Sequence, residues 1–336
     1  MKRDNLNVPV VLFVFSRPDT LKKVFDVLKK VKPKVLFLVS DAPRDFVQGE
    51  KDKVMESRKV VSEIDWECRV IKIYETTNQG LYTMLWSSMD KVFKEYDRCI
   101  FLEDDVVPSV SFFYFMEDLL EKFKDDERIQ QISGMNFLDI YPKNLSDSYF
   151  YSKETSIWGF GLWRRTYLSF DREHSYGKNE YLLKRLKKNM PRSNFKRVIN
   201  YVKHSVSDGH VAGFEYYFGL DKFINNRVSV VPKYNMISNI GCVNESQHEN
   251  TYITMPKEVQ RMYYMKTYEL EFPLKHNEYV IEDECYGKKA RKITGVGHPF
   301  ISFRRKVITV FKLLRYEGFK GLKRKLKKKK RNKKET

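Results

Sequence analysis

The sequence has few cysteines and no long apolar run. Only four cysteines occur in 336 residues, they lie far apart, and they fit no metal-binding spacing. We therefore expect all four thiols to be reduced, which is typical of a cytoplasmic protein. The longest early apolar stretch, residues 8–15, is eight residues long and has no small-residue cleavage site, so we expect no signal peptide. No stretch approaches the roughly 20 apolar residues that a membrane-spanning helix needs.

Acidic residues are scarce at one end of the chain only. The 63 Lys and Arg against 44 Asp and Glu give a formal net charge of +19. Residues 304–336 contain 16 Lys and Arg and 2 Glu, a net of +14, which leaves +5 for the other 303 residues. The chain is therefore a nearly neutral body with a strongly basic tail. With 42% hydrophobic and 15% aromatic residues, the body can bury a substantial core.

Strands alternate with helices through the first hundred residues. Residues 8–15 are apolar on both faces and rich in β-branched side chains, as in a central parallel strand. The further predicted strands are 34–40, 69–74 and 98–102, and the predicted helices are 19–30, 49–64 and 80–96. This alternation predicts a doubly wound α/β half with a mainly parallel sheet. Ligands of such sheets bind beyond the carboxyl ends of the strands.

The pattern changes from about residue 111. Helical spacing recurs at 112–123, 178–188 and 211–225, and short strands are predicted at 129–133 and 227–231. We interpret the residues between 134 and 167 as loops rich in Gly, Trp and Tyr. Residues 244–299 are polar and turn-rich, and they show no clear pattern.

Three adjacent carboxylates, Glu103, Asp104 and Asp105, follow the apolar strand at 98–102. Three like charges at a strand end repel one another, and a hard divalent cation with oxygen ligands would balance them. An ion in this place can also neutralise a leaving diphosphate, which indicates transfer of a group from a nucleotide. The alternative is a solvated loop that caps the following helix.

The other strand ends also carry polar side chains. Arg17 can pair with phosphate or stack on a base through its planar fork, or it is a surface residue before a proline turn. Asp41 can accept a hydrogen bond from an N–H of a base such as uracil, or it caps a turn. Asn78 and Gln79 precede Gly80 at a helix start, where backbone N–H groups and the helix dipole suit a diphosphate or nucleoside.

An aromatic segment, residues 158–165, contains two Trp and two Gly close together. Glycine lets the backbone approach a ligand, and Trp can stack on a sugar face. We interpret Trp158 and Gly159 as contacts to acceptor or sugar. The alternative is a buried aromatic corner, which suits Trp163 equally well.

Two carboxylates in the second half are candidates for a catalytic base. An inverting sugar transfer needs a carboxylate to take the proton of the acceptor hydroxyl. Glu215 is the first candidate and Asp208 the second, although a helix-surface Glu is common. His248 is a candidate metal ligand, against the alternative of an ordinary surface or core histidine.

Taken in order, these motifs resemble GT-A-fold glycosyltransferases. The chain is most similar to bacterial nucleotide-diphospho-sugar transferases related to the eukaryotic N-acetylglucosaminyltransferase I group. The matching segments are 15–18 with Leu21, 40–41, 78–81, 102–105 with Pro108, 112–113, 158–164, 232–241 and 272–276. They span residues 8–276, and the ordered set is more specific than any single piece. Nucleotidyltransferases share a similar fold but open with a Gly-rich loop, and residues 16–19 contain no Gly.

The resemblance implies a GT-A catalytic domain over residues 1–300, with a nucleotide-sugar-binding half at 1–110 and an acceptor half at 111–300. It also implies roles for the strand-end residues. Arg17 and Asp41 would hold the nucleoside, and Asp104 would hold the ribose. Glu103 would contact the transferred sugar, and Asp105 would bind Mn²⁺ or Mg²⁺.

Two positions depart from the family pattern. The position that aligns with Glu215 usually carries Asp in a Trp-Asp-Tyr context, and here the segment reads Phe214-Glu215-Tyr216. Relatives often carry a Thr-His pair where this chain has Gln247 and His248.

We therefore predict a metal-dependent inverting glycosyltransferase, of the hexosyl or N-acetylhexosaminyl type. It would move a sugar from a nucleotide-diphosphate sugar, with UDP-sugars favoured, to a hydroxyl of a glycan or lipid-linked glycan in surface polysaccharide synthesis. One alternative is a catalytically degenerate nucleotide-binding module, suggested by Glu215 in place of Asp. The other is a nucleic-acid-binding protein that acts through its basic tail.

The tail carries a pattern of its own. Apolar side chains recur at near-helical spacing over residues 301–314, and Lys and Arg dominate from 323 to 334. A basic amphipathic helix within 301–336 predicts attachment to an anionic membrane surface. Nucleic-acid binding and a disordered solubilising tail are the alternatives. The apolar face favours lipid, so we expect no nucleic-acid partner and a cytoplasmic protein held on the inner face of the cell membrane.

Overall fold

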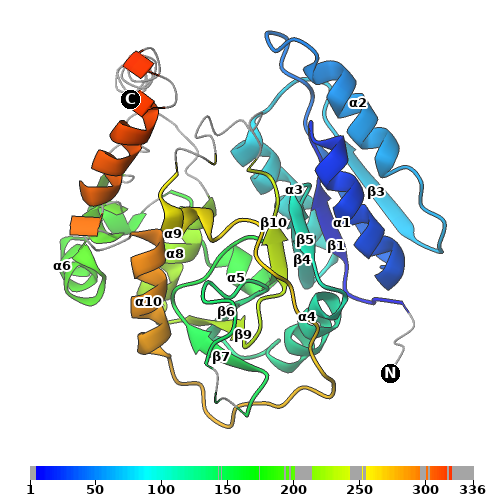
Figure 1. Cartoon of the computed structure of the whole chain (residues 1–336). Coiled ribbons are helices and arrows are strands. Elements are labelled where there is room, and N and C mark those ends of the chain that lie inside the picture. Colours follow the sequence, from blue (N-terminus) through cyan, green and yellow to red (C-terminus); the bar gives the residue numbers. More distant parts are fainter. Residues whose placement is uncertain are drawn as a thin grey trace. The chain divides into compact units, whose positions relative to one another are not determined.

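The computed structural model is a mixed α/β protein built on an eight-stranded sheet (Figure 1). The structure describes residues 5–142, 144, 146–173, 175–192, 194–196, 198–200, 214–242, 252, 255–295, 300–301, 303–315 and 318–319. The strands are β1 (Val10–Phe13), β2 (Val35–Ser40), β3 (Arg69–Tyr74), β4 (Arg98–Glu103), β5 (Val106–Pro108), β6 (Ile129–Ser133), β7 (Tyr149–Ser152), β8 (Phe160–Trp163), β9 (Val228–Pro232) and β10 (Ile237–Asn239). The helices are α1 (Pro18–Val31), α2 (Glu50–Val60), α3 (Leu81–Glu95), α4 (Val110–Lys122), α5 (Arg164–Leu168), the 3₁₀ helix η1 (Ser175–Lys178), α6 (Glu180–Asn189), α8 (Phe214–Ile224), α9 (Lys257–Gln260) and α10 (Glu284–Thr294).

The large sheet has the strand order β3-β2-β1-β4-β8-β6-β9-β7, and β10 pairs with β5 in a separate two-stranded ribbon. Neighbours from β3 to β4 are parallel, whereas β8 and β7 run against their partners. Six of the eight strands therefore point the same way. The sequence-based prediction of a mainly parallel α/β sheet is confirmed. The predicted strands at 69–74 and 129–133 have the predicted bounds.

Helices cover both faces of this sheet. On one face α1 packs against α2 and α4, and α4 contacts β4, β6 and β8. On the other face, Trp86 of α3 makes ring contacts with Tyr167 of α5 and Tyr217 of α8. The buried positions of α1 recur every three to four residues, as the sequence pattern predicted.

Residues 160–163 do not form the ligand-facing loop that we predicted. They form β8, which lies between β4 and β6 near the middle of the sheet. Phe160 stacks on Phe101, and a Cβ at Gly161 would lie 3.0 Å from Leu120 of α4. The glycine therefore permits close packing of a helix, and Trp163 is buried with its indole N–H donating to the Leu120 carbonyl at 2.9 Å. For Trp163 the buried aromatic alternative is correct.

The chain divides into two compact units. The first contains residues 1–170, 213–241 and 264–287, and the second contains residues 171–212, 242–263 and 288–336. Both sheets belong to the first unit, and η1, α6 and α9 belong to the second. The predicted division at residue 300 stays a prediction. Within the described residues, no helix is both long enough and apolar enough to cross a membrane.

The packing beneath β10 gives a test of the core with a matched control. A Cβ at Gly134 would lie 2.5 Å from Phe112 and 2.7 Å from Ile237, whereas a Cβ at Gly219 in α8 would meet nothing within 4 Å. We expect Gly134→Ala to lower the free energy of unfolding by about 1–3 kcal/mol because buried side chains must shift. Gly219→Ala should be neutral or stabilising by about 0.5–1 kcal/mol. Urea denaturation of both variants checks this, and equal stability of the two would contradict it.

Candidate functional site

The carboxyl ends of β1 and β4 bring four of the predicted site residues together. These strands are parallel neighbours with Phe13 opposite Glu103, so the segments that follow them meet at one edge of the sheet. The Phe15 amide donates to Asp104 Oδ2 at 3.0 Å. Arg17 Nη1 lies 3.4 Å from Asp104 Oδ1 and also forms an ion pair with Asp105. We name Glu103, Asp104 and Asp105 the acidic edge.

The acidic edge is partly neutralised by protons. Burial, followed by repulsion from Asp105, raises the pKa of Glu103 to about 8 and that of Asp104 to about 7, while Arg17 opposes both shifts. Glu103 also lines a small cavity of about 20 Å³ whose other walls are apolar, among them Leu85 and Met89. Repulsion between the carboxylates is thus reduced by protonation and by one guanidinium.

The ribbon of β5 and β10 closes around Asp105. β5 begins immediately after Asp105, and the Ile240 amide donates to the Asp105 carbonyl at 2.8 Å. A Cβ at Gly241 would lie 1.8 Å from Asp105 Oδ2, so only glycine fits against this carboxylate. Gly241 belongs to the matching segment 232–241, but we predicted no role for it from the sequence. The glycine at the end of that motif was the available signal.

The donor chemistry of this edge fits a hard divalent ion, because such ions prefer carboxylate oxygens. Among the described residues, no group of three or more His, Cys, Asp or Glu is arranged to hold an ion. The predicted ligand His248 and the second base candidate Asp208 lie outside the described residues. Asp105 is buried and paired with Arg17. Mn²⁺ or Mg²⁺ stays a proposal.

A second group of predicted residues lies at the carboxyl ends of β2 and β3. The Asp41 carboxylate accepts hydrogen bonds from the backbone N–H groups of Ala42 at 2.8 Å, Gln79 at 2.9 Å and Gly80 at 2.8 Å. The Asn78 side chain donates to the Ala42 carbonyl at 2.6 Å. Asp41 therefore acts as the cap that we named as the alternative, and it holds the start of α3 in place. Recognition of a base by Asp41 stays a prediction.

Sequence reasoning missed Arg58 in α2. Its guanidinium donates to Ser40 Oγ at 2.9 Å, to the Asp41 carbonyl at 3.0 Å and to the Glu75 carbonyl at 3.3 Å. It also lies over the Tyr74 ring, 4.6 Å from the centroid. This one side chain ties the end of β2 to the end of β3. The surrounding helix is mostly exposed, and nothing in its sequence distinguished Arg58.

The predicted sugar contacts and the predicted base come from other elements. Gly159 has a φ of 63°, and a Cβ there would lie 2.5 Å from Ile237 of β10, so packing requires this glycine. Trp158 is half-buried next to it. Glu215 is exposed in the first turn of α8. Burial and the nearer carboxylates are the main causes of the raised pKa of Glu103, and the charge of Glu215 adds a smaller contribution.

Lys222 anchors α8 to the segment that precedes Trp158. Its ammonium group donates to the Lys153 carbonyl at 3.0 Å and to the Thr155 hydroxyl. The side chain is buried, and this burial lowers its pKa to about 8. The helix that carries Glu215 is therefore held to the segment that carries Trp158.

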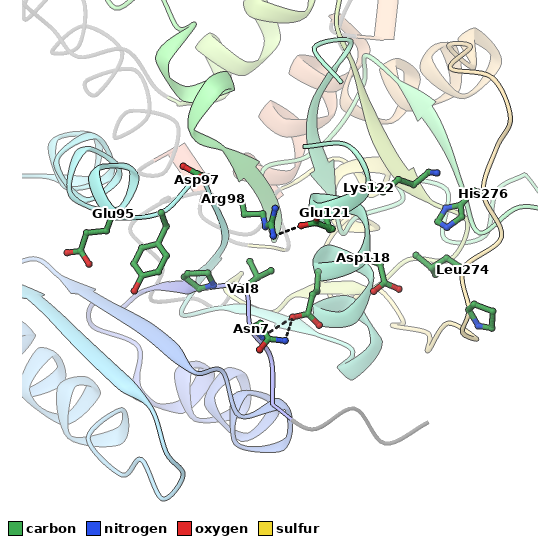
Figure 2. A pocket seen from close by; sticks show the side chains of 14 residues that line it. Asn7, Val8, Glu95, Asp97, Arg98, Asp118, Glu121, Lys122, Leu274 and His276 are labelled. Carbon is green, nitrogen blue, oxygen red and sulfur yellow. Dashed lines mark hydrogen bonds and ion pairs between the residues drawn. The ribbon is translucent and has the colours of Figure 1, made fainter. Parts of the chain in front are cut away.

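A cavity of about 820 Å³ lies at the opposite ends of β1 and β4 (Figure 2). Acidic side chains from α4 line it, and two of these have partners within the cavity wall. Asn7 donates to Glu117 at 2.8 and 3.2 Å, and Arg98 pairs with Glu121 (Figure 2). None of the predicted site residues lies there.

The Arg17 ion pairs give a prediction for stability. In Arg17→Met the buried carboxylates lose their guanidinium partner, so we expect the free energy of unfolding near neutral pH to fall by about 1–3 kcal/mol. Adding Asp105→Asn to Arg17→Met should recover part of this loss, because the uncompensated charge is removed. Lys22→Met, on the exposed face of α1, is the control. Unchanged stability of Arg17→Met would contradict the counter-ion role.

The buried Lys222 gives a prediction for pH dependence. Because its pKa in the folded protein, about 8, is below the ordinary value of 10.5, the cost of burying the charged form is present below pH 8 and is relieved as pH rises toward 10.5. Between these values the wild type should gain about 1–3 kcal/mol relative to Lys222→Met. Lys184→Met, which changes an exposed side chain on α6, should show no such difference. Denaturant unfolding at pH 7, 8.5 and 10 measures it, and parallel curves for wild type and Lys222→Met would refute the assignment.

Comparisons with known proteins give structural likeness only. No protein-family model matches the chain, and no curated protein matches it. Similar solved structures include an apo UDP-glucose pyrophosphorylase, which is 7% identical with a TM-score of 0.35. The match covers 69% of this chain and 93% of the pyrophosphorylase chain. Mouse xyloside xylosyltransferase 1 in its apo form is 12% identical with a TM-score of 0.33. That match covers 66% of this chain and 82% of the xylosyltransferase chain. Likeness at these scores carries no weight for activity, so the function below depends on the residues of the site.

Proposed function

We propose that this protein is a glycosyltransferase that moves a sugar from a nucleotide-diphosphate sugar to a hydroxyl of a glycan or lipid-linked glycan. The observation that carries the proposal is the convergence at one sheet edge of three elements. They are the acidic edge after β4, Arg17 after β1, and the start of α3 held by Asp41. Parallel α/β sheets bind their ligands at this edge.

The residues of the edge offer complementary contacts to such a donor. The Arg17 fork suits phosphate oxygens, and its ion pairs with Asp104 and Asp105 support a position beside the donor. The first turn of α3 contains no acidic side chain, and its backbone N–H groups favour negative charge. We assign Glu103, at the end of β4 beside Asp104 and Asp105, to a contact with a hydroxyl of the transferred sugar.

We assign the acceptor step to Glu215. It is exposed in the first turn of α8, where its carboxylate can take the proton from an acceptor hydroxyl that attacks the sugar. We assign Asp105 to a divalent ion, Mn²⁺ or Mg²⁺, which when bound would neutralise the leaving diphosphate. UDP as the nucleotide, inversion at the sugar and a role in surface polysaccharide synthesis belong to the same proposal and follow the resemblance of the motifs.

The test compares two acidic residues at the two ends of β4. Asp105→Asn changes the carboxylate after the strand, and Asp97→Asn changes an exposed one just before it. Thermal unfolding is followed with a panel of UDP-, GDP- and CMP-sugars, with and without MnCl₂. One donor plus Mn²⁺ should stabilise wild type and Asp97→Asn by about 2.7 kcal/mol at a hundred times its Kd. Asp105→Asn should lose the part of this stabilisation that requires Mn²⁺.

Three outcomes contradict parts of the proposal. If no nucleotide sugar stabilises the protein, nucleotide-diphosphate sugars are excluded as donors. An unchanged ion response in Asp105→Asn would exclude Asp105 as the ion ligand. Donor binding without sugar transfer to any glycan or lipid-linked acceptor would favour the alternative, a catalytically degenerate nucleotide-binding module.

A further inference from the structure

Residues 303–315 are helical, and one side of this helix is fixed within the second unit. Arg305 is buried and donates from Nη2 to the carbonyls of Lys292 at 3.0 Å and Ile293 at 2.7 Å, at the end of α10. Leu313 is buried. Lys312 donates to the Met255 carbonyl at 2.8 Å. These contacts determine which side of the helix faces inward.

The opposite side of the helix exposes large apolar side chains. Phe303 is 68% exposed, Val307 50%, Val310 41% and Phe311 73%. Their spacing of i, i+4, i+7 and i+8 places them on one stripe, which we name the exposed stripe. A helix on a globular protein usually turns such a stripe toward the core, but here the inward side contains a buried arginine instead.

Basic residues lie at both margins of the exposed stripe. At roughly 100° per residue, Arg304 lies on one margin and Lys306 on the other. Arg304 also pairs with Glu258, and Lys306 is exposed. Counting these two, residues 304–336 contain 16 Lys and Arg against 2 Glu. An apolar stripe between basic margins is complementary to an anionic lipid surface, because apolar side chains enter the acyl boundary while cations contact headgroups.

We propose that the exposed stripe docks this helix on the surface of an anionic lipid bilayer. Phosphate-backbone binding to a nucleic acid would use the cations but leave four apolar side chains in water. The proposal does not depend on the glycosyltransferase assignment, since none of its residues belongs to the acidic edge.

The test uses the full-length protein and flotation with vesicles. One vesicle is phosphatidylcholine alone, and the other contains about one third phosphatidylglycerol, which supplies negative surface charge. The variant Phe303→Ser with Phe311→Ser removes the two most exposed aromatic side chains of the stripe. Phe46→Ser is the matched control, because Phe46 is 86% exposed in the first unit. Thermal unfolding checks both variants, and the exposure of the three changed side chains predicts no loss of fold.

We expect wild type and Phe46→Ser to float with the anionic vesicles and the double variant to bind about tenfold or more weakly. Equal binding of the double variant and wild type would overturn the proposal, as would failure of wild type to bind the anionic vesicles. A duplex DNA probe is run in parallel at the same salt concentration. Capture of wild type by DNA but not by vesicles would assign the tail to nucleic acid and also overturn the proposal.

Discussion

The ion pairs between Arg17 and the two aspartates after β4 are the interaction on which the candidate site depends. Two buried carboxylates beside a third would repel one another and carry a large desolvation cost. Arg17 supplies the opposite charge from the neighbouring strand, and the Phe15 amide adds a hydrogen bond to Asp104. Because β1 and β4 are adjacent and parallel, their order in the sheet makes this pairing possible.

The same interaction changes how the three carboxylates are interpreted. From the sequence, we predicted that a metal ion balances the three carboxylates. In the structure, the Arg17 guanidinium contacts both Asp104 and Asp105. An ion at Asp105 and the Arg17 contact therefore involve the same carboxylate. Binding of a diphosphate would give Arg17 a second anionic partner, so donor and ion are expected to affect each other's affinity through this residue.

Buried strands and their ends could be predicted from the sequence, since runs such as residues 34–40 and 98–102 are apolar and bounded by charge. The convergence of Arg17 with Asp104 depends on the adjacency of β1 and β4, and the alternation of strands and helices did not specify this strand order. The packing role of Gly159 could not be predicted, because a glycine needed for packing against Ile237 looks the same in the sequence as one that approaches a ligand. Arg58 could not be found either, since most of its hydrogen bonds go to backbone carbonyls, which are the same in every sequence. The actual ligand contacts of the site residues stay predictions.

The contact between Gly241 and Asp105 joins parts of the chain that are 136 positions apart. Residues 1–110 contain the strand-end side chains, but the wall behind Asp105 comes from the ribbon strand β10 and the glycine after it. The packing around Asp105 therefore depends on a segment that lies outside residues 1–110. During synthesis on the ribosome, the acidic edge would stay open until residues 237–241 have emerged, so a protein truncated before them could not assemble the site.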